Sequence, residues 1–162
     1  MRFHRKATPQ TALTALATAT TSAIPIQTTL VLLDPTSHDG ENALALLDAT
    51  DEHITLLVLL SGPASRSLRD FARAEDIDMF TAGWRYLEQV VERVDSAPEQ
   101  LLAMTASGPS AAVELADVAA TETVRRVLLP SSVDRLEPGL AGLLARCVQA
   151  PVLTAPTFTH VG

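Results

Sequence analysis

Residues 29–37 read TLVLLDPTS, a short apolar run that ends in an aspartate, a proline and two hydroxyl side chains. The run Thr29–Leu33 carries no alternation of apolar and polar residues, which is typical of a strand covered on both faces. The polar residues from Asp34 to Ser37 then begin a loop. A strand buried on both faces is the unit of a sheet that has helices on either side.

Apolar runs and helical patterns alternate along the rest of the chain. Further strands are predicted at Ile54–Leu60, Leu101–Thr105, Val124–Leu129 and Val152–Thr154. Helices are predicted at Glu41–Asp48, Ser65–Arg73, from Asp76 to before Pro98, Ala111–Ala120 and Leu140–Val148. Strands separated by helices of this length pair in parallel through right-handed crossovers. We therefore predict an α/β fold, Rossmann-like in its open parallel sheet, with helices on both faces.

The first 27 residues differ from the rest of the chain. They hold Arg2, Arg5 and Lys6, no acidic residue, and many threonines and alanines. Three interpretations are open: a poorly ordered tail, an organelle transit peptide, or a secretory signal whose apolar core is interrupted by threonine. We favour the tail, and we expect residues 28–162 to form a single domain.

The charge of the chain excludes some classes of partner. The net charge is −7, and residues 28–162 are more acidic than the whole because the basic leader lies outside them. An acidic body repels nucleic acid and anionic membranes, and no apolar run approaches the roughly 18 residues of a membrane span. The single cysteine, Cys147, forms no internal disulfide and suits a reducing compartment. We expect a cytoplasmic protein.

The loops that follow the predicted strands share a composition. Residues 34–37, 61–65, 107–110 and 130–132 all contain proline and hydroxyl side chains. Ligands of open α/β sheets bind at the carboxyl ends of the strands, where helix N-termini and serines attract phosphate or carboxylate. Serine and proline are also ordinary residues at the start of a helix. Both interpretations of these loops remain open.

Four segments, in this order and spacing, resemble the universal stress protein family over about residues 28–156. They are LLDPTS at 32–37, ITLLV at 54–58, SGPSAAV at 107–113 and APVL at 150–153. The resemblance implies a five-stranded sheet in the order 3-2-1-4-5, as in the adenine nucleotide alpha hydrolase-like folds. It also implies a regulatory or stress-response function and a homodimer formed by the closing strand.

The same resemblance implies particular site residues. In the family, the aspartate after the first strand lies near adenine and ribose, although Asp34 could equally cap the turn before the next helix. The candidate ligand-binding residues are Asp34, Thr36, Ser37, Ser131, Ser132 and Gly139. The candidate dimer residues are Val152, Leu153 and Thr154.

One departure from the family concerns its glycine-rich ATP-binding loop. Pro130 stands in place of the first glycine and Val133 in place of the second, and only Gly139 matches the third. Proline has no amide to donate and has a fixed φ, whereas glycines let backbone amides approach phosphates closely. Asp134 and Glu137 add negative charge to this loop. We therefore expect no ATP binding there.

Two alternatives remain. The protein could still bind ATP, AMP or a smaller anion at the strand ends, near Ser131 and Ser132. It could also be a nucleotidyltransferase, because residues 34–41 and 131–135 resemble the His-any-Gly-His and Ser-Ser-Thr-any-any-Arg motifs of those enzymes. Glu41 stands where the second imidazole is needed and would repel phosphates. The histidines show no metal-ligand spacing, so we expect no metal and no catalytic residue.

Overall fold

The computed structural model describes residues 26–37, 40–62, 65–94, 100–104, 111–121 and 124–156. The leader up to residue 25 and the serine-containing loop at 107–110 lie outside the described residues. Within the described ranges, no helix combines the length and apolar character needed to cross a bilayer.

A single parallel sheet forms the centre of the fold. Its strands are β1 (Thr28–Leu33), β2 (Ile54–Leu59), β3 (Gln100–Met104), β4 (Val124–Leu129) and β5 (Val152–Thr154). They lie in the order β3-β2-β1-β4-β5, and all four neighbouring pairs are parallel. The central strand β1 therefore has β2 on one side and β4 on the other.

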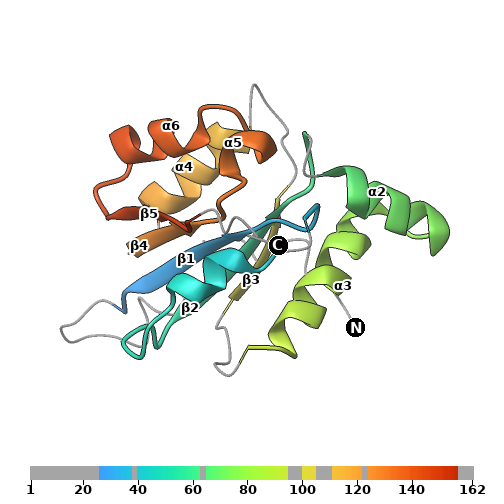
Figure 1. Ribbon diagram of the computed structural model, residues 1–162, viewed down its shortest axis with the longest axis horizontal. Helices are drawn as coiled ribbons and strands as arrows, with labels where there is room; N and C mark the ends of the chain where they lie inside the picture. The colour runs from blue at the N-terminus through green and yellow to red at the C-terminus, as the bar shows by residue number, and fades with distance from the viewer. Residues whose placement is uncertain are drawn as a thin grey trace, which may run out of the picture.

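Helices cover both faces of this sheet (Figure 1). One face carries η1 (Asn42–Leu46), α2 (Ser65–Ala74) and α3 (Met79–Val91). The other carries α4 (Ala111–Thr121), α5 (Val133–Leu136) and α6 (Leu140–Cys147). This three-layer arrangement confirms the predicted α/β class with a parallel sheet.

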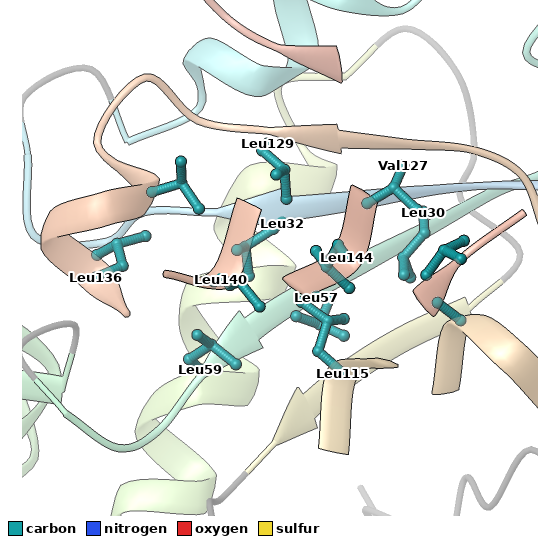
Figure 2. Packing of buried hydrophobic residues seen from close by; sticks show 13 residues of the cluster. Leu30, Leu32, Leu57, Leu59, Leu115, Val127, Leu129, Leu136, Leu140 and Leu144 are labelled. Carbon is teal, nitrogen blue, oxygen red and sulfur yellow. The ribbon is translucent and has the colours of Figure 1, made fainter. Parts of the chain in front are cut away.

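Successive residues of each central strand belong to different layers of the core. Leu30 and Leu32 of β1 pack with α4, α5 and α6, whereas Val31 and Leu33 pack with α2 and α3. Figure 2 shows the first of these clusters, in which strand side chains meet Leu115, Leu140 and Leu144 from the helices. Because side chains alternate across a strand, a run that is apolar at every position serves both layers at once.

Two of the predicted helices differ from the observed ones. The helix expected from Asp76 begins instead at Met79, because Asp76 adopts a left-handed φ of 52° and ends α2. The amide of Ile77 donates to the carbonyl of Ala72 at 2.9 Å, as in a Schellman motif. Asp78 then caps α3 by accepting from the amide of Thr81 at 2.9 Å.

The remaining differences concern two short helices. The stretch expected as a helix over Glu41–Asp48 is only the 3-10 helix η1, and the loop after β4 contains the short helix α5, which the sequence pattern did not predict. Cys147 is exposed, because Val148 takes the buried position that follows α6.

A buried ion pair joins the amino-terminal ends of β1, β2 and β4. The Asp51 side chain, which is 0% exposed, accepts hydrogen bonds from Nη2 and Nε of Arg126, the latter at 3.1 Å, and from the hydroxyl of Thr29. Arg126 also contacts Asp48 at 3.2 Å. Burial acts to raise the pKa of Asp51, but the hydrogen bonds from Arg126 and Thr29 outweigh it and lower the pKa below 3.8.

We expect Asp51→Asn to lower the free energy of unfolding by about 3 kcal/mol at pH 7, because it leaves Arg126 without its buried partner. A carboxylate with a lowered folded pKa stabilises the fold above its unfolded value and loses this effect at lower pH. The stability difference between the wild type and the variant should therefore shrink as the pH falls below 3.8. Urea unfolding over a pH series measures it.

Glu52→Gln, at an exposed neighbouring position, is the matched control and should change stability by less than about 0.5 kcal/mol. Equal losses in the two variants at pH 7 would contradict the structural importance of the buried pair.

Candidate functional site

The carboxyl end of β1 carries a buried carboxylate. Asp34 is 0% exposed, and its Oδ1 accepts from the amide and the hydroxyl of Thr36 at 2.7 and 2.5 Å. Its Oδ2 accepts from the hydroxyl of Ser132 in the loop after β4. Arg135 of α5 lies 3.9 Å from the same oxygen. The carboxylate is thus satisfied by groups of this chain.

A second set of contacts closes the loop after β1. The amide of Asp34 donates to the carbonyl of Gly40 at 2.8 Å, and the side-chain amide of Asn42 donates to the hydroxyl of Ser131 at 2.7 Å. A Cβ on Gly40 would lie 2.1 Å from the carbonyl oxygen of Asp34. Only glycine fits this close approach. The loops after β1 and β4 are therefore joined at two points, one through each serine.

An open cavity of about 580 Å³ lies beside this junction. It is bounded by the loops after β1 and β2, by the first turns of α2, and by α5. The residues that line it are Thr36, Gly62, Arg66, Ser67, Arg69, Asp70, Arg135 and Leu136. Its volume is within the roughly 300–1,000 Å³ typical of small-molecule sites.

Arginines dominate the polar lining of this cavity. Arg66 and Arg69 extend from α2, and Arg135 extends from α5 with 72% of its side chain exposed. The Arg69 guanidinium donates to the hydroxyl of Ser65 at 2.9 Å, which orients it. Among the lining residues that the structure describes, Asp70 is the only carboxylate. The arrangement can attract and hold an anion.

A smaller apolar cavity of about 170 Å³ adjoins the first one at Ser67. The hydroxyl of Ser67 donates to the carbonyl of Pro35 at 2.8 Å and so connects α2 with the loop after β1. Tyr86 lines the smaller cavity, and within the described part of the chain its buried hydroxyl has no hydrogen-bond partner. Burial, followed by the nearby charges of Glu41 and Asp34, raises the pKa of Tyr86, so the phenol is neutral.

The structure brings together some of the ligand-binding residues predicted from the sequence. Asp34, Thr36 and Ser132 form one hydrogen-bonded cluster, but of these only Thr36 lines the cavity. Ser37 lies in the loop after β1 and does not line the cavity. Gly139 is exposed at the start of α6 with a φ of 80° and lies outside the lining.

The cavity arginines were not among the predicted site residues. Arg66 and Arg69 stand three residues apart, directly after the proline-containing loop at 61–65. That spacing places two cations on one face at the start of a helix, which is a usable signal. The negative net charge of the whole chain gave no indication of this local pair of arginines. Within the described ranges, no group of three or more His, Cys, Asp or Glu side chains could hold a metal ion.

Comparison with known proteins supports the fold and nothing finer. No family model matches the chain, and no curated protein matches it significantly. The solved structure of the hypothetical protein PH0823 is similar, with a TM-score of 0.55 and 18% identity over 84% of this chain and 99% of that one. The hypothetical protein MJ0577 is similar too, with a TM-score of 0.56 and 16% identity over the same shares.

We expect Gly40→Ala to reduce the free energy of unfolding by about 2 kcal/mol, because the added methyl group must displace the backbone of Asp34. The matched control is Gly142→Ala in α6, where the nearest atom lies 3.8 Å away. Alanine favours a helix over glycine by about 1 kcal/mol, so the control should be neutral or stabilised. Chemical denaturation measures both, and similar stabilities for the two variants would contradict the close approach at Gly40.

Proposed function

We propose that this chain is a regulatory module of the universal stress protein type that acts as a homodimer, by binding and not by catalysis. We also propose that it does not hold ATP in the loop after β4. The fold's likeness to PH0823 and MJ0577 supports the first statement only at the level of architecture. The observation that carries the proposal is the hydrogen bonding of this loop.

Four backbone amides of the loop after β4 are already bonded within the loop. The amides of residues 133, 135, 136 and 137 donate to the carbonyls of Pro130, Ser132 and Val133, at distances of 2.9 to 3.1 Å. Pro130 has no amide to donate. A polyphosphate cradle consists of amides that point outward into a concave loop. Here the same amides close the turn that forms α5.

The side chains of the loop also oppose a polyphosphate. Val133 is 2% exposed and Leu136 is 1% exposed, so both anchor the loop in the core and hold it in its closed form. Asp134 and Glu137 place carboxylates on the outer side, where phosphates would be repelled. Opening this loop to accept phosphates would remove two apolar side chains from the core.

The edge strand β5 supports the proposed homodimer. The amide of Val127 donates to Pro151, and the amide of Ala155 donates to Leu129, so residues 151 and 155 face β4. Alternation along the strand then directs the amides of Val152 and Thr154 toward the open edge. Leu153 is 41% exposed, which is unusual for a large apolar side chain of the described part. A second copy that pairs with this edge would use the open groups.

Our first test removes the three arginines that line the cavity and determines whether the loop after β4 binds ATP without them. In a variant with Arg66, Arg69 and Arg135 all changed to Gln, we expect ATP with Mg²⁺ to give no thermal stabilisation. A ligand at a hundred times its dissociation constant would add about 2.7 kcal/mol. Stabilisation of this variant by ATP, with backbone amides of residues 131–139 protected from exchange, would contradict the proposal.

Our second test addresses the dimer. Val152→Pro removes an amide that faces the open edge and leaves the bonds to β4 in place, so it should shift the protein to the monomer without unfolding it. Sedimentation equilibrium measures the association, and thermal unfolding reports the integrity of the fold.

The matched control is Glu52→Gln, an exposed change away from β5, which should leave association unchanged. A Val152→Pro variant that remains as dimeric as the wild type would exclude β5 as the interface. A wild type that sediments as a monomer at all concentrations would exclude the homodimer itself.

A further inference from the structure

We propose that the 580 Å³ cavity between α2 and α5 binds a small organic phosphate monoester through the guanidinium groups of Arg66, Arg69 and Arg135. This site goes beyond the proposed function, because it binds an anion through arginine side chains and not through the backbone of the loop after β4. It also lies apart from the predicted ligand residues Ser131, Ser132 and Gly139, none of which lines the cavity.

The local charge at the cavity opposes that of the molecule as a whole. Of its lining residues in the described ranges, three are arginines and one, Asp70, is a carboxylate, while the chain carries a net charge of −7. Asp34 lies behind Arg135 but is buried and bonded by Thr36 and Ser132. Glu137 and Asp134 are further acids of this edge that do not line the cavity, and Glu137 lies within 3.6 Å of the place of a Cβ on Gly62. Among the residues that line the cavity, the surplus of positive charge favours an anion.

The placement of the arginines is costly without a ligand. Arg66 and Arg69 are three residues apart on one helix, and like charges at this spacing destabilise a helix by a few tenths of a kcal/mol. They stand in the first turns of α2, where the helix dipole also disfavours cations. Arg69 is held by Ser65, whereas within the described residues Arg66 has no hydrogen-bond or ion-pair partner. A bound anion would neutralise both costs.

The number of guanidinium groups indicates the class of anion. A carboxylate has two oxygens and is matched by a single arginine fork. A phosphate monoester carries two charges and three free oxygens, so several forks from different directions can share it. Here two arginines come from α2 and one from α5. The cavity is also larger than a phosphate group, which leaves space for an organic substituent.

Binding at this place would connect the two helical layers. α2 is anchored by Leu68 in the core on one face of the sheet, and α5 by Val133 and Leu136 in the core on the other face. α5 is also joined to β1 through the hydrogen bond from Ser132 to Asp34. A phosphate held by arginines of both helices would bridge the layers at the rim and stabilise their relative position.

The test uses glycerol 3-phosphate as the probe, titrated by calorimetry at constant ionic strength, with acetate and glycerol in parallel. We expect the wild-type protein to bind glycerol 3-phosphate, and to bind neither acetate nor glycerol at the same concentrations. Arg66→Gln/Arg69→Gln and, separately, Arg135→Gln should each weaken binding at least tenfold. The three arginines are exposed, so the variants should retain the wild-type circular dichroism spectrum and a cooperative unfolding transition.

The matched control is Arg73→Gln, which removes the same charge from the same helix but at a residue that does not line the cavity. It should keep affinity within twofold of the wild type. The proposal is overturned if the wild type does not bind glycerol 3-phosphate, or if acetate binds as tightly. It is also overturned if the cavity variants bind as well as Arg73→Gln does.

Discussion

The buried carboxylate of Asp34 holds the loops at the carboxyl edge of the sheet in place. It follows the central strand β1, accepts two hydrogen bonds from Thr36 and accepts a third from Ser132 in the loop after β4. A carboxylate without water must have its oxygens occupied, or its burial would be strongly unfavourable. Asp34 therefore determines where α5 begins. The position of α5 in turn determines one wall of the neighbouring cavity.

The edge of the sheet combines a closed loop with an open, basic cavity. In the loop after β4 the amides of residues 133 and 135–137 are bonded to carbonyls of the same loop, and Val133 and Leu136 hold it in the core. Beside it, flexible and exposed arginine side chains line a space large enough for a small molecule. Recognition through side chains tolerates a rigid loop, whereas recognition through amides needs glycines. A chain that lacks two of the three glycines can therefore still carry the proposed anion site at the usual edge of an α/β sheet, through its side chains.

The opposite end of the sheet has a buried ion pair. Asp51 and Arg126 join the segment before β2 to the start of β4. Both ends of the sheet thus place an aspartate next to an arginine, but with different consequences. Asp51 is directly bonded to Arg126, whereas Arg135 lies 3.9 Å from Asp34 and keeps its guanidinium toward the cavity. Only the second arrangement leaves a cation available to a ligand.

The sequence by itself determined the strands, and for β1 and β2 their burial on both faces, because runs such as Thr29–Leu33 are apolar at every position and this pattern is local. It also determined that the loop after β4 lacks the first two glycines of the family's loop, where Pro130 restricts the backbone in any context. The end of α2 at Asp76 was not predictable, because aspartate adopts a left-handed φ only occasionally and no glycine marks this position. Only the tertiary structure decided that Arg135 meets Arg66 and Arg69 at one cavity. Arg135 lies far from Arg66 and Arg69 in the chain, on a helix of the opposite layer. A local sequence pattern cannot predict which residues distant in the chain line the same cavity.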